Sequence, residues 1–406
     1  MKNILTRILI VNCVYDPEPV VSAQLGKSLA EKLSNEGHSV SVIAPFPSRP
    51  FGFSFNGTVK KKGIDKEVVN DQLTVYRLPS FTYPKSGIFG RLLESISFGW
   101  AAFKYVRRNS ENIDTVYMNT WPLFGQFGVA VACKTKKIKY LMHIQDVYPE
   151  SLTNRLPRLF SKAVNLFLFP LEKYSVHNAS RVIVISKKMQ AYIASTRNIP
   201  ENSIDVVLNW QDHDAFEAYK DYWNPGKLTF MYLGNIGAVS GLNFVLSAFI
   251  KTGLDAKLIV AGNGTKKQEC VEIAKENPKV DIEFWEVPTG KVAMTQSHAH
   301  VLLLPLIKGA AGSSIPSKLP AYMFSARPIL ACVDSDSDTF NAIAEANCGW
   351  VGAPEDVEWL RKTMISASKL KITELQELGN NGRNYCLSNF SKEINLQKLV
   401  TSISDA

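Results

Sequence analysis

The sequence lacks several features that would place it in a specialised class of protein. None of its six cysteines belongs to a Cys-x-x-Cys pair, so neither a disulfide framework nor a zinc site is indicated. No run of about 18 apolar residues occurs, and no long apolar core follows Met1. We therefore expect neither a membrane-spanning helix nor a signal peptide. The 24 glycines and 20 prolines are close to average usage, which excludes collagen-like and low-complexity classes. A globular protein of the reducing cytoplasm remains.

What the chain does have is length and positive charge. Its 406 residues are enough for two or three domains of about 150 residues each. The 46 Lys and Arg residues exceed the 37 Asp and Glu residues, which gives a net charge of +9. This excess favours an anionic partner, such as a phosphorylated small molecule or a membrane surface. Nucleic acid is disfavoured, because the basic residues form no clustered motif.

Short apolar runs alternate with segments of helical spacing along most of the chain. The runs read as strands buried on both faces, and the alternation predicts mostly parallel sheets covered by helices. The predicted strands are residues 8–11, 39–44, 115–118, 139–144, 181–185, 228–233, 257–261, 281–284, 301–304 and 329–333. The pattern pauses near residue 210 and then restarts. We expect an α/β fold of two doubly wound, Rossmann-like domains, residues 1–210 and 211–387, facing a central cleft.

The C-terminal stretch reads as mostly helical. A break is expected between Gly379 and Gly382, because glycine weakens a helix. The last helix, about 388–406, is expected to pack back on the first domain.

Glycine turns follow two predicted strands of the second domain. Binding sites in such sheets lie at the carboxyl ends of the strands. The turns are Gly234-Asn235-Ile236-Gly237 and Ala261-Gly262-Asn263-Gly264. Each is compatible both with an ordinary tight turn and with backbone N–H groups that approach a phosphate.

A third segment, Gly312 to Lys318, leaves a strand and enters a helix near Pro316. Its free N–H groups, the hydroxyls of Ser313, Ser314 and Ser317 and the ammonium of Lys318 could converge on one anion. A solvated surface lysine is the alternative for Lys318.

The stretch around Lys318 resembles a known family. Pro316-Ser317-Lys318-Leu319 and Ala326-Arg327-Pro328-Ile329 resemble the donor-site helix of bacterial GT-B glycosyltransferases of glycosyltransferase family 4, of the colanic-acid and O-antigen type. Further matching segments follow in the family's order over nearly the whole chain: Gly37-His38-Ser39-Val40, Asp146-Val147-Tyr148-Pro149-Glu150-Ser151, Val184-Ile185-Ser186, Asn209-Trp210 and Tyr232-Leu233-Gly234-Asn235-Ile236-Gly237.

The resemblance implies a set of site residues. On the donor side they are Gly234, Asn235, Gly237, Gly262, Gly264, Val287, Ser313, Ser314, Ser317 and Lys318. On the acceptor side, relatives place a His or an Arg-Asp pair near the end of a central strand. Alignment by Asp146 puts Gln145 at that position, and alignment by the histidine puts His143 there. Asp146 and Glu150 are candidates for a general base or an acceptor ligand, and either could instead cap a helix.

The sequence departs from the family where phosphate and sugar are held. Ser313 and Ala321 stand where many relatives have two glutamates, and residues 235–240 contain no basic side chain. Lys318 is then the nearest candidate to neutralise the diphosphate. Arg327 is a second candidate, or it faces solvent.

An aspartate run, Asp334-x-Asp336-x-Asp338, has a spacing seen in metal-dependent transferases. With Glu345 it also resembles a calcium loop, but that loop needs glycine where Thr339 stands. Asp338 reads instead as the N-cap of a helix that follows it. We expect neither a bound metal nor a cofactor.

Residues 88–108 and 156–169 mix aromatic and basic side chains. The pattern fits equally an anionic membrane surface and two core helices with a basic outer face.

By resemblance, the protein moves a hexose or N-acetylaminosugar from a nucleotide sugar, with a UDP-sugar favoured, to a lipid-linked saccharide. The pathway would be O-antigen, capsule or exopolysaccharide biosynthesis, with the enzyme peripheral on the inner face of the cell membrane. A nucleotide-sugar epimerase of the same architecture and a non-enzymatic two-domain binding protein are the alternatives.

Overall fold

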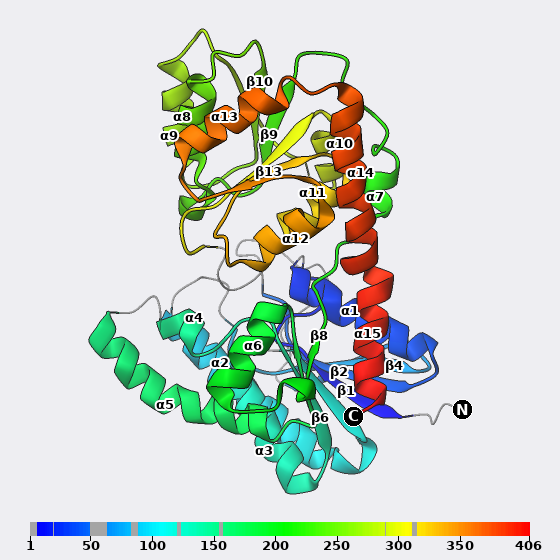
Figure 1. Ribbon diagram of the computed structural model, residues 1–406. Coiled ribbons are helices and arrows are strands. Elements are labelled where there is room, and N and C mark those ends of the chain that lie inside the picture. The colour runs from blue at the N-terminus through cyan, green and yellow to red at the C-terminus, as the bar shows by residue number, and fades with distance from the viewer. Residues whose placement is uncertain are drawn as a thin grey trace. The chain divides into compact units, whose positions relative to one another are not determined.

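The computed structural model describes residues 6–18, 20–48, 63–82, 88–119, 123–153, 157–288, 290–310 and 315–406. The chain forms two compact units (Figure 1). Unit 1 consists of Met1–Val207 together with Leu396–Ala406, and unit 2 consists of Leu208–Asn395. Each unit contains one sheet, so the predicted α/β class with two Rossmann-like sheets is confirmed.

Unit 1 has an eight-stranded sheet in the order β3-β4-β2-β1-β5-β6-β7-β8. All neighbours are parallel except the hairpin of β3 and β4, which is antiparallel and bulged near Val68. The strands are β1 (Arg7–Val11), β2 (Ser39–Pro45), β3 (Asp65–Asn70), β4 (Leu73–Leu78), β5 (Thr115–Asn119), β6 (Lys139–Ile144), β7 (Arg181–Val184) and β8 (Ile204–Val206).

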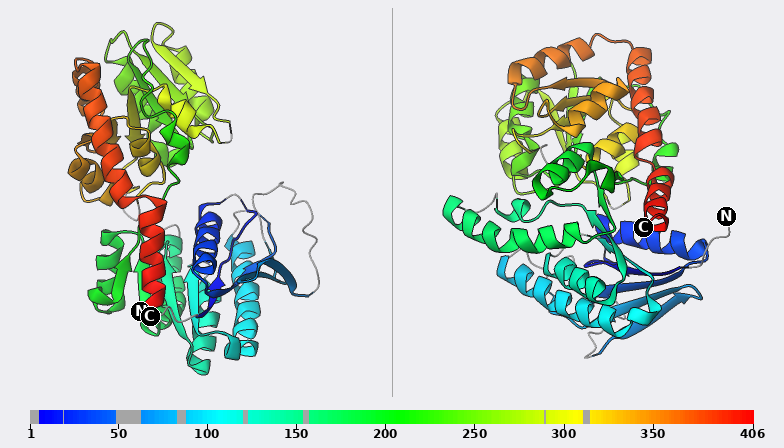
Figure 2. Two further views of the ribbon diagram at one scale, coloured as in Figure 1. Left: turned by 90° about the vertical axis from the view of Figure 1, so that its right-hand side faces the viewer. Right: turned by 60° about the horizontal axis from the view of Figure 1, so that its bottom comes forward.

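Helices cover both faces of this sheet (Figure 2). They are α1 (Val21–Asn35), α2 (Ile88–Arg108), α3 (Leu123–Lys136), α4 (Glu150–Thr153), α5 (Arg158–His177) and α6 (Lys187–Arg197). Leu9 and Val116 pack with Phe98 of α2 and Val129 of α3 in one buried cluster. Helix α1 lies on the opposite face, as right-handed crossovers require when the strand order runs in the other direction.

Unit 2 has a six-stranded, fully parallel sheet in the order β11-β10-β9-β12-β13-β14. The strands are β9 (Thr229–Leu233), β10 (Lys257–Ala261), β11 (Asp281–Trp285), β12 (Val301–Pro305), β13 (Ile329–Cys332) and β14 (Gly349–Gly352). The strand order reverses between β9 and β12, and ligands of doubly wound sheets bind at such a switch point.

The sheet of unit 2 has a buried apolar cluster on each face. Alternate residues of β9 supply them: Met231 lies in one cluster and Phe230 in the other. The helices of unit 2 are α7 (Asp214–Glu217), α8 (Leu242–Ile250), α9 (Lys267–Lys275), α10 (Val292–Ser297), α11 (Lys318–Phe324), α12 (Asp338–Ala346), α13 (Val357–Ala367) and α14 (Ile372–Asn389). Helix α15 (Lys392–Ser404) begins in unit 2 and belongs to unit 1 from Leu396 onward.

The predicted helix break between Gly379 and Gly382 is wrong. Helix α14 runs through both residues and ends at Asn389. A Cβ at Gly379 would lie 2.1 Å from the carbonyl oxygen of Ala326, and one at Gly382 would lie 2.9 Å from Cβ of Cys348. These glycines let α14 approach its neighbours closely, so they serve packing and do not interrupt the helix.

Candidate functional site

The two glycine turns of unit 2 meet at the carboxyl ends of β9 and β10. The backbone N–H of Gly234 donates to the carbonyl of Ala261 at 3.0 Å. A Cβ at Gly262 would lie 2.1 Å from the oxygen of Gly234, and both glycines have positive φ, +133° and +153° respectively. Only glycine allows this approach of the two backbones. The two turns therefore form one compact structure at the switch point of the sheet.

The following residues of the two turns also contact each other. Ile236 donates its N–H to the oxygen of Asn263 at 2.8 Å, and a Cβ at Gly264 would lie 2.3 Å from the oxygen of Ile236. Asn235 is exposed and Gly237 half-buried. Gly234, Asn235, Gly237, Gly262 and Gly264 thus lie in two turns that contact each other at the carboxyl ends of β9 and β10.

Lys318 reaches into this group from the start of α11. Its Nζ donates to the Tyr232 hydroxyl at 2.7 Å and lies 4.2 Å from the centroid of that ring. A Cβ at Gly234 would lie 3.0 Å from Nζ, so the glycine leaves the space that the lysine occupies. Burial lowers the pKa of Lys318 to about 8. Among the residues that the structure describes, no carboxylate pairs with this ammonium.

The remaining donor-side candidates are partly buried, exposed or outside the residues that the structure describes. Val287 follows β11 and packs, partly buried, against the core. Ser317 is exposed, and α11 begins at Lys318, two residues later than the helix start expected near Pro316. Ser313 and Ser314 lie outside the described residues.

The sequence left two roles open for Arg327: binding phosphate or facing solvent. The structure supports neither role. The side chain is fully buried. Its guanidinium donates to the oxygens of Ala299 (2.9 Å) and Lys220 (3.1 Å) and lies 4.3 Å from the Trp223 ring centroid. Burial lowers its pKa to about 10. Backbone carbonyls already satisfy this cation, so its role is to tie loops together.

His143 of unit 1 lies near the carboxyl end of β6 and is buried. Its Nδ1 is 2.6 Å from the Tyr117 hydroxyl, while its Nε2 is buried without a partner among the described residues. Burial lowers the pKa of His143 to about 4, so the imidazole is neutral at pH 7. A neutral ring whose Nδ1 accepts from Tyr117 keeps its proton on Nε2.

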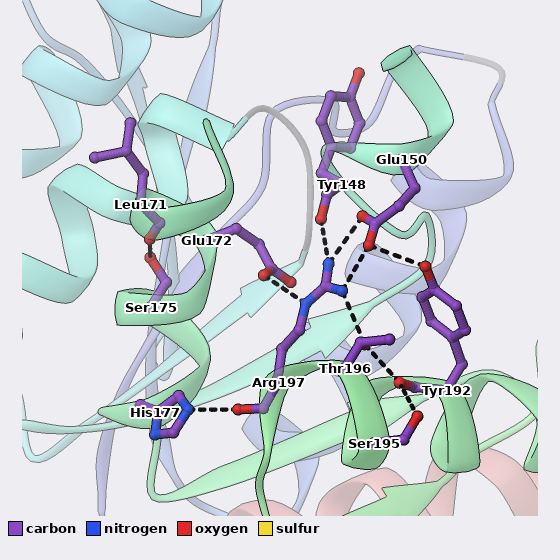
Figure 3. Close-up of polar contacts among 10 residues, drawn as sticks. All are labelled: Tyr148, Glu150, Leu171, Glu172, Ser175, His177, Tyr192, Ser195, Thr196 and Arg197. Atoms are coloured by element: carbon purple, nitrogen blue, oxygen red, sulfur yellow. Dashed lines mark hydrogen bonds and ion pairs between the residues drawn. The ribbon is translucent and has the colours of Figure 1, made fainter. Parts of the chain in front are cut away.

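The other acceptor-side candidates follow β6 directly. Gln145 is half-buried and Asp146 is exposed. Glu150 begins α4, and its two carboxylate oxygens accept from Nη1 and Nη2 of Arg197 at 2.6 and 2.9 Å (Figure 3). The Tyr192 hydroxyl donates to the same carboxylate at 3.1 Å. Glu150 is thus held in one orientation, whereas the carboxylate of Asp146 faces solvent.

Arg197 is a buried residue that the sequence analysis did not single out. Besides Glu150, it contacts the carbonyl of Tyr148 at 2.6 Å and the carboxylate of Glu172 at 2.8 Å. Burial lowers the pKa of this guanidinium, but hydrogen bonds and charges from Glu150 and Glu172 outweigh it and raise that pKa overall. A basic residue in the last turn of a helix complements the helix dipole, so the sequence carried no signal for this cluster.

The aspartate run has structural partners. The backbone N–H of Gly309 donates to Asp334 at 2.9 Å. Ser337 is the N-cap of α12, because its hydroxyl accepts from the N–H of Phe340 at 3.2 Å. The prediction that Asp338 is the cap is therefore wrong by one residue, since Asp338 already forms the first turn. The described part of the chain contains no group of three or more His, Cys, Asp or Glu residues that could hold a metal ion.

Helices α2 and α5 expose large apolar side chains. On α2 they are Leu92, Leu93, Ile96 and Trp100, and on α5 they are Phe160, Leu166 and Phe167. Phe167 is 74% exposed. A shallow groove on α5 is lined by Lys162, Asn165, Leu166, Phe169 and Pro170. No described helix is both long and apolar enough to cross a bilayer.

Comparison with known proteins finds similarity to glycosyltransferases. Residues 26–215 match the model of Glycosyltransferase Family 4. The probable glycosyltransferase WbjE of Pseudomonas aeruginosa is 24% identical over 276 residues, which are 65% of this chain and 68% of the relative.

Solved structures agree in fold. A glycosyltransferase from Rickettsia africae superposes with a TM-score of 0.68 at 13% identity, covering 99% of this chain and 98% of the other. Anabaena HepE, solved in complex with UDP and glucose, superposes with a TM-score of 0.65 at 12% identity, covering 99% and 100%. The fold is that of GT-B glycosyltransferases.

Proposed function

We propose that this protein transfers a hexose or N-acetylaminosugar from a UDP-sugar to a lipid-linked saccharide in bacterial surface-polysaccharide biosynthesis. The name of WbjE supports the reaction class, and the UDP and glucose in the HepE complex support the donor. The family match over residues 26–215 also supports the reaction class.

The ammonium of Lys318 carries the proposal for the donor side. It is partly buried, and it has no carboxylate partner in the described chain. It lies beside Gly234, where the two glycine turns meet at the carboxyl ends of β9 and β10. A diphosphate there would gain a charge-assisted hydrogen bond from Nζ and close approach to the backbone of Gly234. Charge that develops on the leaving nucleotide would be stabilised by the same ammonium.

Asp146 is our candidate for contact with the acceptor hydroxyl. It is exposed directly after β6, whereas Glu150 is engaged by Arg197 and His143 is buried and neutral at pH 7. A free carboxylate can accept the hydroxyl proton or orient the hydroxyl by a hydrogen bond. Gln145, beside it, would add a neutral hydrogen-bonding group.

We propose that no metal takes part. The described chain offers no cluster of metal ligands, and the ammonium of Lys318 supplies the positive charge that a cation would otherwise provide.

The exposed apolar residues of α2 and α5 support peripheral attachment to the inner membrane face. Phe160 and Phe167 would enter the interfacial layer of the membrane. This surface would also bring a lipid-linked acceptor to unit 1.

Calorimetric titration with UDP, ADP and GDP tests the donor assignment. UDP should bind most tightly, and its affinity should be unchanged in EDTA. Incubation of UDP-glucose, UDP-galactose and UDP-N-acetylglucosamine with bacterial lipid extract should then yield a labelled glycolipid for one donor. If none of the nucleotides binds, the proposed function is wrong. Conversion of a donor to another UDP-sugar without lipid would indicate an epimerase.

Co-sedimentation with phosphatidylglycerol–phosphatidylcholine vesicles tests the membrane assignment. Replacing both Phe160 and Phe167 with serine should remove most of the binding at low salt. Ile372→Ser, which changes an exposed apolar residue of unit 2, is the matched control and should bind like wild type.

A further inference from the structure

Arg197 joins three parts of unit 1 that are far apart in the chain. It is the last residue of α6, and its guanidinium binds Glu150 and the carbonyl of Tyr148, which follow β6 (Figure 3). The same guanidinium binds Glu172 of α5 at 2.8 Å. Its backbone carbonyl accepts from Nε2 of His177, the last residue of α5, at 2.6 Å.

Helix α5 contacts Arg197 from two positions on either side of Pro170. The ring of Phe169 lies 4.8 Å from the guanidinium carbon, and Glu172 follows three residues later. Phe167, two residues before Phe169, is 74% exposed and belongs to the apolar surface of the same helix. One helix therefore presents an apolar surface to the outside and two ligands to a buried cation.

The geometry makes these contacts interdependent. A guanidinium is a planar fork, so its two bonds to Glu150 fix the direction in which Nε donates to Glu172. Side-chain exposure is 0% for Arg197, 2% for Glu172 and 21% for Glu150. Separating buried charges is strongly unfavourable, so α5 and the segment after β6 shift together more readily than apart.

We propose that Arg197 is a positioning residue that couples α5 to residues 146–150, the segment that carries Asp146. This inference rests on the proposed function, in which α5 meets the membrane and Asp146 meets the acceptor. Contact of α5 with a lipid surface would then set the position of the acceptor-side segment. Arg197 itself touches neither sugar nor acceptor.

Hydrogen exchange of peptides covering residues 146–153 tests the coupling in solution. Phe169→Leu changes only the α5 side of the contact, and it should speed exchange in residues 146–153 by about fivefold or more. Phe167→Leu is the matched control on the exposed side of the same helix and should leave that exchange unchanged. Equal exchange in the two variants would overturn the inference.

Vesicles of phosphatidylglycerol and phosphatidylcholine provide the second measurement. In wild type they should slow exchange both in α5 and in residues 146–153. The variant R197M/E172L removes the cation and its most buried partner together, so that neither is left uncompensated, and here only α5 should be protected. Protection of α5 alone in wild type, or of both regions in the variant, would contradict the coupling.

The two proposals fail differently. If vesicles protect neither region, the membrane assignment is wrong, and the solution comparison of Phe169→Leu with Phe167→Leu still decides whether Arg197 couples the segments.

Discussion

Arg197 of unit 1 and Lys318 of unit 2 are both withdrawn from solvent, but they differ in what surrounds them. Arg197 meets the carboxylates of Glu150 and Glu172 and a backbone carbonyl, so its charge and its donors are used within the protein. Lys318 meets the Tyr232 hydroxyl and an aromatic ring, which satisfy a donor but bring no negative charge.

We propose that the difference separates a structural cation, Arg197, from a ligand-binding cation, Lys318. Burial acts against the charge of both residues, yet the pKa of Arg197 is raised by its carboxylates, whereas burial lowers that of Lys318 to about 8. A cation that is desolvated but not neutralised gains most when an anion arrives. The charge balance around each residue therefore points to an internal partner for one and a ligand for the other.

The largest expected effect is on stability and concerns Arg197. Arg197→Met should lower the free energy of unfolding by about 3–5 kcal/mol, because it leaves the carboxylate of Glu172 buried and uncompensated. Urea unfolding measures the loss. The double variant R197M/E172L should recover most of it, and failure to recover would show that packing of the arginine, not its charge, stabilises unit 1.

Lys318→Ala should give the next largest effect, on binding and not on folding. Loss of a charged hydrogen bond to the diphosphate should weaken UDP binding by about 1.5–3 kcal/mol, roughly 10- to 150-fold. Calorimetry measures the affinity and thermal unfolding checks the fold. Lys279→Ala is the control. This exposed lysine precedes β11, at the amino ends of the strands and away from the site at their carboxyl ends, so the variant should bind UDP normally. Equal affinity of both variants would remove Lys318 from the site.

The pH dependence of UDP binding should sharpen the contrast further. The pKa of Lys318 is lowered to about 8 in the free protein, and a bound diphosphate would raise it. Below about pH 8 the lysine is protonated before and after binding, so affinity is at its maximum. Above that pH, binding must take up a proton, and the Kd should rise by about tenfold per pH unit. Lys318→Arg should bind without this dependence, because a guanidinium stays protonated.

The smallest expected effect concerns the aspartate run. Ser337→Ala should cost about 1 kcal/mol of stability, because it removes the cap of α12. Asp338→Ala should cost less, about 0.3–0.5 kcal/mol, since only its favourable position near the helix dipole is lost. Thermal unfolding compares the two, and a larger loss for Asp338→Ala would restore it as the cap.

Sequence reasoning succeeded for structural features that are determined by neighbouring residues in the chain or by the topology of a parallel sheet. The central strands were predicted from continuous apolar runs, and Gly234, Gly262 and Lys318 meet because each follows a parallel strand of one sheet. It missed β3, whose side chains are mostly exposed, its hairpin partner β4, the three-residue strand β8, and β14, which has glycine at both ends.

The two buried arginines show what local reasoning could not reach. The partners of Arg197 lie 25 and 47 residues away, and Arg327 binds carbonyls up to 107 residues away. The sequence around each arginine resembles an ordinary helix end or loop. Gly379 and Gly382 were misread for a related reason, since the atoms that require glycine belong to residues 326 and 348.

The division of the chain has a consequence for synthesis on the ribosome. Unit 2 is inserted between Val207 and Leu396, and unit 1 takes its final segment from the C-terminal end, where Leu399, Val400 and Ile403 are buried. The unit whose translation starts first is therefore the one that is completed last. A nascent chain released at residue 395 would contain all of unit 2, but it would leave unit 1 without the apolar residues that finish its packing.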